Sequence, residues 1–458
     1  MHWLTIVFIV ILAILLVTLV VLLGFTLTSR PSEVNRLASG KQAPQRRTQV
    51  LPTSAEPMND DELLAELQRL IESSEVDLSQ AMRQLGLGTQ ISSRASVSPP
   101  DPTEQDNVNR ATQLLSAVSR TSTATNVERS YGTGRGIVIC AGGFEYGTLA
   151  LMLVKLLRKS ECQLPIEIWS RTNELSEDMT NMFIEMDCKV RDIDAVSSVT
   201  FFSRFAIKPL AVYHSEFQQV LLLDADNICI NNPEYLFEML SEQQPAVFWP
   251  DNWPLDRNAL CYKTLDDKQV SRMTFNLTQD SGQVLVDKQY CMKALSVCVR
   301  INVQLHGHLK RLFPEPYAGG DKDTWNFAWL TTNTPFFMIP HRPGGAGTND
   351  AQGQYIGTTS IQYDMDQKPI FLHKMRAKWP SQTQKPQWLD CVRFLHPYPR
   401  GRVNPWSFRF EDGPVEKGRF HETFDDIEER CWEVLGEVRN LDWYGRTYAS
   451  EMKDLGLQ

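Results

Sequence analysis

The chain has 458 residues, a formal net charge of −9 and a hydrophobic content of 42%. This length allows a large buried core and more than one domain. The acidic balance argues against a nucleic-acid-binding protein, because such proteins need a basic surface, but it does not exclude a neutral partner such as a glycan.

Residues 4–27 contain no charged side chain and follow a short tail, residues 1–3. As a helix rising ~1.5 Å per residue, this segment can cross a hydrocarbon core of ~30 Å. A cleaved signal peptide is the alternative, but its apolar region is usually only ~7 to 15 residues long and ends at a small-residue cleavage site. We therefore expect a retained transmembrane anchor.

Residues 28–130 are rich in Ser, Thr, Pro, Gln and Asn and contain few aromatic residues. This composition is typical of a flexible linker, here a stem. Within it, acidic residues at 60–62 precede leucines at helical spacing, which predicts a short amphipathic helix near residues 60–85. Either this helix is solvated, or it joins copies of the chain or a different partner into an oligomer.

From residue 131 onward, apolar strands alternate with helical segments, which predicts an α/β fold with a mostly parallel sheet. A strand near Ile137 is followed by Gly142 and Gly143 and then by a helix near Leu151. Glycines at this position let the backbone approach a nucleotide, although a tight turn alone also explains them.

A strand that ends at Leu223 runs directly into Asp224 and Asp226. Ligands of open α/β sheets bind at the carboxyl ends of the strands, and paired carboxylates suit a divalent cation that carries a diphosphate. Acidic pairs after strands also form turns and helix caps. Residues 246–253 predict another short strand, in which Trp249 and Trp253 would offer a sugar stacking faces and Asp251 a hydrogen-bond acceptor.

Eight segments resemble, in order and spacing, the fungal Golgi α-mannosyltransferases of glycosyltransferase family 71. They are GRGIVI (134–139), LPIEIW (164–169), KPLA (208–211), LLDADN (222–227), FWPD (248–251), DSGQ (280–283), GDKD (320–323) and FLH (371–373). The resemblance implies a GT-A nucleotide-diphospho-sugar transferase fold, with a Rossmann-like mixed sheet, for residues 131–380. It also implies that residues 381–458 form a C-terminal extension packed on this domain.

The resemblance implies a metal site as well, formed by Asp226, Asp224 and His373. Mixed oxygen and imidazole ligands suit Mn²⁺ better than Mg²⁺ or Ca²⁺. From composition alone, His373 would instead be a core histidine.

Further roles come from the same resemblance. The nucleotide sugar would contact Asp224, Lys208, Gly142, Gly143, Trp249, Asp251 and Lys378. Asp321 and Asp280 would lie at the reacting centre. Either Asp321 or Asp323 also fits the N-cap of a helix that starts near Thr324, and Asp323 is the better placed of the two.

The implied activity is transfer of mannose from GDP-mannose to mannose-containing glycans with retention of configuration. Two routes to retention stay open: a covalent glycosyl intermediate, or acceptor attack on the leaving-group face. A UDP-hexose donor is one alternative, and a non-catalytic Golgi protein that binds glycans or scaffolds other enzymes is another.

The implied location is the Golgi membrane, with a single type II anchor and a lumenal catalytic domain. Basic residues between 30 and 47 follow the anchor, and the positive-inside rule taken alone would leave the remainder in the cytosol. The resemblance and the sequon at Asn276 favour the lumen.

All nine cysteines follow residue 139, and their spacing includes no CxxC pair. A lumenal location would permit disulfides, whose pairing the sequence does not assign. Cys140 and Cys229 are expected to be small buried core residues.

Overall fold

The computed structural model describes residues 102–120, 131–197, 204–273, 276–305, 309–313, 320–394, 407–408 and 415–445. The chain divides into two compact units, residues 1–63 and 64–458, and everything described belongs to the second. The predicted anchor, residues 4–27, and the predicted helix near residues 60–85 lie outside the described residues. Within the described ranges, no helix is both long and apolar enough to cross a membrane.

The first sheet has seven strands in the order β3-β2-β1-β4-β7-β6-β8. The β3, β2, β1 and β4 strands are parallel, whereas β7 runs antiparallel to both β4 and β6. The β6 and β8 strands at the other end are parallel to each other, so β7 alone runs against its neighbours and the predicted mixed α/β sheet is confirmed. The strands are β1 (Arg135–Cys140), β2 (Ile166–Ser170), β3 (Cys188–Asp192), β4 (Gln219–Asp224), β6 (Ala246–Pro254), β7 (Leu277–Asp287) and β8 (Phe337–Met338).

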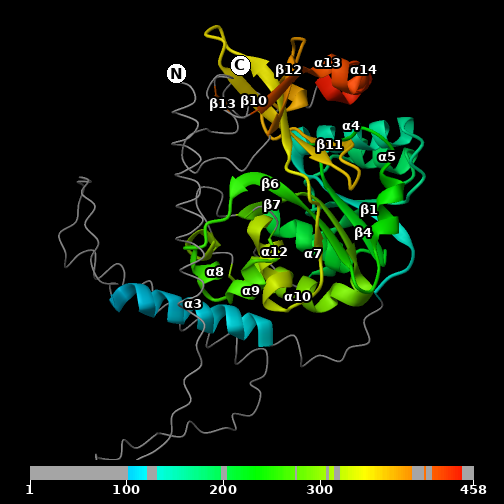
Figure 1. Cartoon of the computed structure of the whole chain (residues 1–458). Helices are drawn as coiled ribbons and strands as arrows, with labels where there is room; N and C mark the ends of the chain where they lie inside the picture. Colours follow the sequence, from blue (N-terminus) through cyan, green and yellow to red (C-terminus); the bar gives the residue numbers. More distant parts are fainter. Residues whose placement is uncertain are drawn as a thin grey trace, which may run out of the picture. The chain divides into compact units, whose positions relative to one another are not determined.

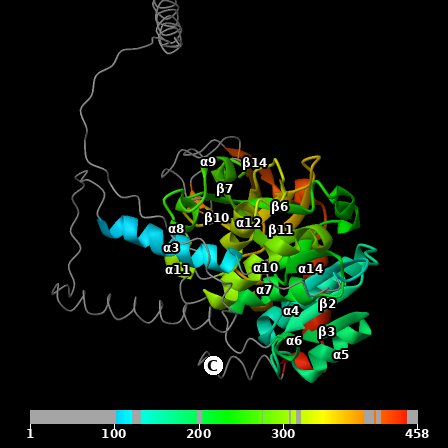
Figure 2. The same ribbon diagram turned by 90° about the horizontal axis from the view of Figure 1, so that it is seen from below.

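Both faces of this sheet are buried, which explains why its strands are nearly continuous aliphatic runs. In β1, Ile137 and Ile139 belong to one core cluster and Val138 belongs to the other. The first cluster includes α4 (Gly143–Lys159), α5 (Glu177–Glu185) and α14 (Ile427–Arg439), and the second includes α7 (Ile207–His214), α10 (Lys288–Gln304) and α12 (Lys322–Thr331). Figures 1 and 2 show α7, α10 and α12 together on one side of the sheet.

A helix also lies inside the range that was predicted to be stem. This helix, α3 (Pro102–Arg120), contributes Ala111, Leu115 and Val118 to the second core cluster. The guanidinium of Arg300 on α10 donates a hydrogen bond of 3.3 Å to the carbonyl of Val118. Residues 107–118 therefore pack as part of the globular unit, which differs from the flexible stem predicted for residues 28–130.

The second sheet has the order β14-β12-β9-β10-β11-β5, and a short strand β13 pairs with β10. Only Ala225 and Asp226 separate β4 from β5, so the chain passes from the first sheet to the second at the Asp-Ala-Asp triplet. The strands are β5 (Asn227–Cys229), β9 (Gly344–Asn349), β10 (Tyr355–Tyr363), β11 (Pro369–His373), β12 (Asp390–Phe394), β13 (Ser407–Phe408) and β14 (Val415–Arg419).

Segments after residue 380 pack on the same unit. The β12 strand pairs with β9, and α14 lies against α4, where Lys155 forms an ion pair of 2.9 Å with Glu437. The shorter elements are α6 (Ile193–Val196), α8 (Leu260–Lys263), α9 (Asp267–Val270), α11 (Leu309–Leu312), α13 (Phe420–Phe424) and the 3₁₀ helices η2 (Arg204–Ala206), η3 (Pro233–Met239) and η6 (Trp379–Ser381).

All nine cysteines are free thiols. Cys229 is buried as predicted, whereas Cys140 at the end of β1 is only partly buried. Burial raises the pKa of the Cys229 thiol well above its ordinary value, so this residue behaves as a small core side chain.

Lys288 provides a test of the core. It begins α10, is 1% exposed, and donates a hydrogen bond of 2.6 Å from Nζ to the Ser215 carbonyl. Burial lowers its pKa from 10.5 to about 8, against the opposing charge of Glu167. Between these pH values the unfolded chain binds a proton that the folded chain has lost, so this group makes the folded state more stable as pH rises.

We therefore expect Lys288→Met to be more stable than the wild type near pH 7, by at most ~3.5 kcal/mol at ~1.4 kcal/mol per pKa unit. The advantage should shrink as pH rises from 8 to 10.5. The free energy of unfolding of both chains, measured across this range, checks the prediction, and parallel pH profiles would contradict it.

Candidate functional site

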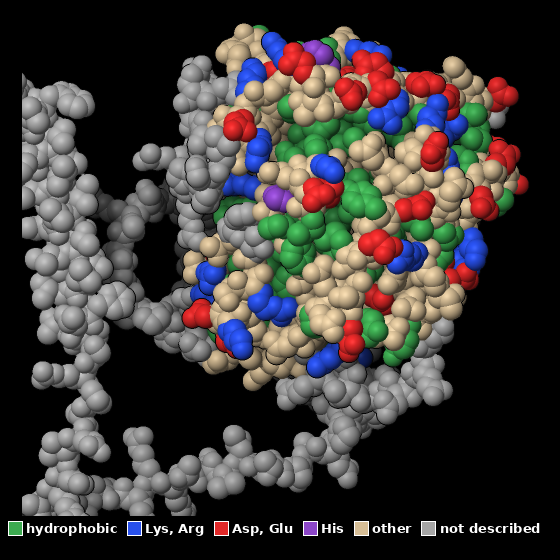
Figure 3. All heavy atoms as spheres, turned by 45° about the vertical axis from the view of Figure 1, so that its right-hand side comes forward, with side chains coloured by type: hydrophobic (Ala, Val, Ile, Leu, Met, Phe, Trp, Pro, Cys, Tyr) green, Lys and Arg blue, Asp and Glu red, His purple; other side chains and the backbone are tan. Residues whose placement is uncertain are grey.

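A cavity of about 1150 Å³ opens at the carboxyl ends of β1, β2 and β4. It is lined by the glycine turn after β1, the loop after β2, the carboxylates at the end of β4, the middle of β7 and the end of β11. Ligands of open α/β sheets bind at this edge. On the face in Figure 3, acidic and basic side chains are interspersed, so the described part of this face lacks the continuous basic stripe that nucleic acid requires.

Two carboxylates and one imidazole meet at the junction of the sheets. Candidate ligand atoms of Asp224, Asp226 and His373 all lie within 4.8 Å of one another. The Nε2 atom of His373 is 3.4 Å from Asp226 Oδ1 and 3.8 Å from Asp224 Oδ2. Antiparallel pairing of β11 with β5 places His373 opposite Asn227, directly beside the acidic pair.

His373 is oriented by Asp280, which comes from β7. Both carboxylate oxygens of Asp280 lie 3.2 Å from Nδ1 of the imidazole. Asp280 also accepts hydrogen bonds of 2.9 Å from the Gly282 amide and from Nε2 of Gln362. Burial lowers the pKa of His373, but the charge of Asp280 outweighs this effect and the net pKa is raised. Asp280 therefore turns the other ring nitrogen toward Asp226.

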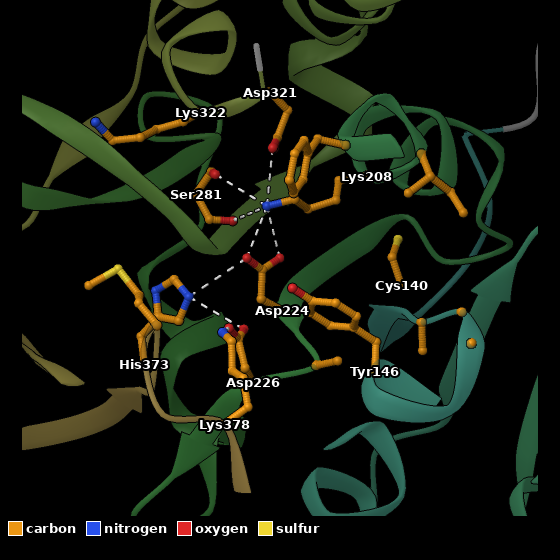
Figure 4. A pocket seen from close by; sticks show the side chains of 18 of the residues that line it. Cys140, Tyr146, Lys208, Asp224, Asp226, Ser281, Asp321, Lys322, His373 and Lys378 are labelled. Carbon is orange, nitrogen blue, oxygen red and sulfur yellow. Dashed lines mark hydrogen bonds and ion pairs between the residues drawn. The ribbon is translucent and has the colours of Figure 1, made fainter. Parts of the chain in front are cut away.

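Lys208 on α7 bridges two acids across the cavity (Figure 4). Its Nζ lies 2.9 Å from Asp224 Oδ1 and 3.1 Å from Asp321 Oδ1. Burial lowers the pKa of Lys208, but the two carboxylates outweigh it and raise the pKa overall, so this lysine stays charged. The second oxygen of Asp321 accepts a hydrogen bond of 2.7 Å from the indole of Trp325.

The α12 helix starts earlier than predicted. Its first residue is Lys322, and Asp321 occupies the N-cap position without a side-chain cap. The prediction of Asp323 as the N-cap is therefore wrong, since Asp323 lies in the first turn. The side chain of Asp321 is free of a capping bond because it pairs with Lys208 and Trp325 instead.

Lys378 approaches the acidic pair from the loop after β11. Its ammonium contacts the Asp226 carboxylate and donates a hydrogen bond of 3.0 Å to the Lys374 carbonyl. It also lies 5.9 Å from the centre of the Tyr146 ring. Burial lowers the pKa of Lys378 to about 8, although the charge of Asp224 opposes this shift.

Gly142 and Gly143 form the turn between β1 and α4, and both line the cavity. The φ of Gly143 is +66°, a left-handed conformation that favours glycine. A Cβ atom on Gly142 would come within 2.2 Å of Glu174 Oε2. The backbone conformation therefore favours glycine at residue 143, whereas a side chain at residue 142 would displace the Glu174 carboxylate.

Asp251 lines the cavity, and its Oδ2 pairs with Nζ of Lys322 at 2.9 Å. Trp249 differs from the prediction, because it is fully buried and does not line the cavity. Its indole donates a hydrogen bond of 2.9 Å to the Tyr363 carbonyl. The register of β6 shifts between Phe248 and Trp249 and again between Pro250 and Pro254, and the tryptophan of this strand that lines the cavity is Trp253.

The structure thus gathers every predicted site residue except Trp249 around one cavity. Tyr146, Arg171, Glu174, Ser281 and Lys322 also line the cavity and were not predicted as site residues, whereas Trp253 was expected to offer a stacking face and does line the cavity. Tyr146 could have been predicted from the sequence, since it follows the glycines by less than one helical turn. The others depend on how separate strands end at one edge.

Gly282 lies directly beside the imidazole of His373, so a side chain at this position would collide with the ring. A Cβ atom there would lie 2.4 Å from Nδ1 and 2.5 Å from Cε1 of His373. Because the ring is held by Asp280, we expect Gly282→Ala to cost ~1–3 kcal/mol through overpacking and to lower the Tm by several degrees. Differential scanning fluorimetry of the full chain measures this shift.

Gly436 on α14 is the matched control, because a Cβ atom there would meet nothing within 4 Å. Alanine within a helix is more stable than glycine, so Gly436→Ala should leave the Tm unchanged or slightly raised. Equal Tm values for the two variants would show that the imidazole of His373 can move away from the added methyl group without loss of stability.

The sequence of the chain is similar to those of known proteins. The chain is 27% identical over 348 residues to alpha-1,2-mannosyltransferase MNN21 of Candida albicans, a match that covers 60% of this chain and 51% of the relative. It is 25% identical over 276 residues to alpha-1,2-mannosyltransferase MNN2 of Saccharomyces cerevisiae, covering 51% and 46%. The chain spans about half the length of the curated relatives it matches.

Among solved structures, mouse xyloside xylosyltransferase 1 in its apo form aligns with 45% of this chain and 84% of its own, at 14% identity and a TM-score of 0.32. A score this low supports no argument about fold or activity. The family model described as "Mannosyltransferase putative" matches residues 134–276 and 267–367. Together these ranges span residues 134–367, 234 of the chain's 458 residues. The chain therefore belongs to this family of putative mannosyltransferases.

Proposed function

We propose that this protein is a Golgi α-mannosyltransferase of the GT-A fold, which transfers mannose from GDP-mannose to mannose-containing glycans with retention of configuration. The observation that carries the proposal is the triad Asp224, Asp226 and His373 at the carboxyl ends of the strands, flanked by Lys208 and Lys378. The relatives, named alpha-1,2-mannosyltransferases, favour an α-1,2 linkage. Residues 4–27 would supply a single type II anchor.

The triad fits a divalent cation. Two carboxylates and one imidazole offer ligand atoms within 4.8 Å of one another, a mixed donor set that suits Mn²⁺. Asp280 fixes the imidazole through Nδ1, as carboxylates commonly do for metal-bound histidines. When bound, such a cation would stabilise the negative charge that develops on the departing diphosphate.

Lys208 and Lys378 would bind the phosphate oxygens. Lys208 is fixed by two carboxylates and by Ser281, whose Oγ lies 3.3 Å from Nζ. Lys378 is held by its contact with Asp226 and by a backbone carbonyl. Because both side chains are already oriented, little entropy is lost when they meet a diphosphate.

Asp321 bears on the two routes to retention. Its Oδ1 pairs with Lys208 and its Oδ2 accepts a hydrogen bond from Trp325. A carboxylate engaged at both oxygens is a weak nucleophile, which favours acceptor attack on the leaving-group face over a covalent intermediate at this residue. In this proposal Asp321 holds Lys208 in place and keeps negative charge near the sugar.

The sugar would lie toward Asp251, Lys322 and Trp253, all of which line the cavity. Asp251 is fixed by Lys322, and Lys322 in turn donates a hydrogen bond of 2.8 Å to Thr278 Oγ1. Fixed polar groups beside an aromatic face suit the hydroxyls and the apolar ring face of a hexose.

The full chain, purified in detergent, tests this proposal. With Mn²⁺ and mannose oligosaccharides, we expect transfer from GDP-mannose and not from UDP-hexoses. Asp226→Ala should lower the rate by roughly 100-fold or more, since it removes a direct source of charge stabilisation. Asp366→Ala, in the exposed turn between β10 and β11, is the control and should transfer normally.

Transfer from a UDP-hexose would show that the donor is a UDP-sugar and not GDP-mannose. A folded chain that is inactive with every donor would instead indicate a glycan-binding or scaffold protein. Full activity of Asp226→Ala would contradict the metal site itself.

A second experiment separates two roles for Asp280. If Asp280 acts by orienting His373, Asp280→Asn should weaken Mn²⁺ binding by ~10- to 100-fold and leave the rate at saturating Mn²⁺ largely intact. If it contacts the sugar directly, Mn²⁺ affinity should stay unchanged while kcat falls. Titration with Mn²⁺, followed by electron paramagnetic resonance and by activity, distinguishes the two.

A further inference from the structure

We propose that Glu174, in the loop between β2 and α5, binds the base of the donor nucleotide and selects guanine. The inference rests on the proposed function and names a residue that would determine donor specificity. Glu174 lines the same cavity as the metal triad, together with Gly142, Gly143, Arg171 and Asn173.

The strand order places Glu174 at a suitable distance from the triad. The β2, β1 and β4 strands are consecutive neighbours in the first sheet. Adjacent strands are ~4.8 Å apart, so the loop after β2 lies ~10 Å from the end of β4. A nucleotide held by its diphosphate at Asp224 and Asp226 can therefore extend its nucleoside across β1 toward Glu174. Figure 4 shows Tyr146, from the first turn of α4, reaching into the space beside Asp224.

The backbone fixes this loop. The Gly143 amide donates a hydrogen bond of 2.8 Å to the Glu174 carbonyl, and the Glu174 amide donates one of 3.1 Å to the Arg171 carbonyl. Arg171 pairs with Asp194 at 3.0 Å. The Glu174 carboxylate fits above Gly142 because residue 142 has no side chain, since a Cβ atom there would approach Oε2 to 2.2 Å.

The Glu174 carboxylate itself remains available to a ligand. The residue is exposed, and within the described part of the chain its carboxylate accepts one long hydrogen bond, 3.4 Å from the Arg171 amide to Oε2. Its negative charge lies at the N-terminal end of α4, where the helix dipole favours an anion. A phosphate at that place would be repelled, so this end of the cavity suits a group that donates hydrogen bonds.

Guanine matches that requirement. Its N1–H and 2-amino group are adjacent donors, which a carboxylate can accept with its two oxygens. Uracil offers one N3–H between two carbonyl oxygens, and a carboxylate would face both of them. A site built around a paired donor set rejects a ligand that leaves the acceptor unpaired.

The test compares GDP, IDP and UDP, because IDP differs from GDP only in lacking the 2-amino group. Binding to the full chain in detergent with Mn²⁺ is measured by calorimetry. For the wild type we expect GDP to bind on the order of 10-fold more tightly than IDP, and UDP to bind more weakly than either. In Glu174→Gln the ratio of GDP to IDP affinity should fall toward one.

Glu177→Gln is the matched control, since Glu177 is also exposed, lies three residues further along at the start of α5, and does not line the cavity. It should keep the wild-type ratio. A Glu174→Gln chain that is folded, binds GDP and still prefers it over IDP would overturn the inference and leave the proposed function standing. Preference of the wild type for UDP would overturn the inference and change the donor. Failure of the wild type to bind any of the three nucleotides would overturn both.

Discussion

The two sheets of this protein meet where the chain crosses between them in two residues, Ala225 and Asp226. Because β4 ends at Asp224 and β5 begins at Asn227, the acidic pair cannot move independently of either sheet. Pairing of β5 with β11 then brings a histidine from far along the chain to the same point. Backbone hydrogen bonding between strands thus fixes the positions of Asp224, Asp226 and His373, the candidate metal ligands. Such a framework is more rigid than one built from loops.

Several buried aspartates lie close together at this junction, and their negative charges require positive partners. Asp226, Asp280 and Asp321 are all buried, and an unpaired buried carboxylate would cost several kcal/mol. Lys208, Lys378 and His373 supply the opposite charges. The pairs leave the site close to neutral before a ligand arrives, so a bound cation would have to compete with the lysine beside Asp226. Ligand binding and the stability of the fold are therefore linked at this junction.

Much of the fold could be predicted from the sequence. Strands near Ile137 and Leu222 were recognisable because a strand buried on both faces is a continuous aliphatic run. The acidic pair was recognisable because carboxylates are unusual directly after such a run. His373 was identified by resemblance alone, since its place beside Asp226 depends on pairing between strands more than 130 residues apart.

Other features could not be predicted, for physical reasons. Trp249 was assigned to the wrong environment because the register shifts in β6 alter which side chains face the cavity. The buried residues of α3 were hidden in a segment of linker-like composition. The role of Asp280 depends on one partner from its own strand, Gly282, and on two from other strands, Gln362 of β10 and His373 of β11. The anchor, the domain limits and the Golgi location stay predictions.

The packing of α14 against α4 has a consequence for how the protein is made. Lys155 and Glu437, which join these helices, are 282 residues apart along the chain. A chain synthesised only to residue 380 would already contain every residue assigned to the cavity, yet it would lack the helix that covers α4 and the strands that complete the second sheet. Contacts of such long range form late and slowly. The nascent chain would thus carry a full set of site residues, with apolar surface of α4 exposed, until its last segment has been released.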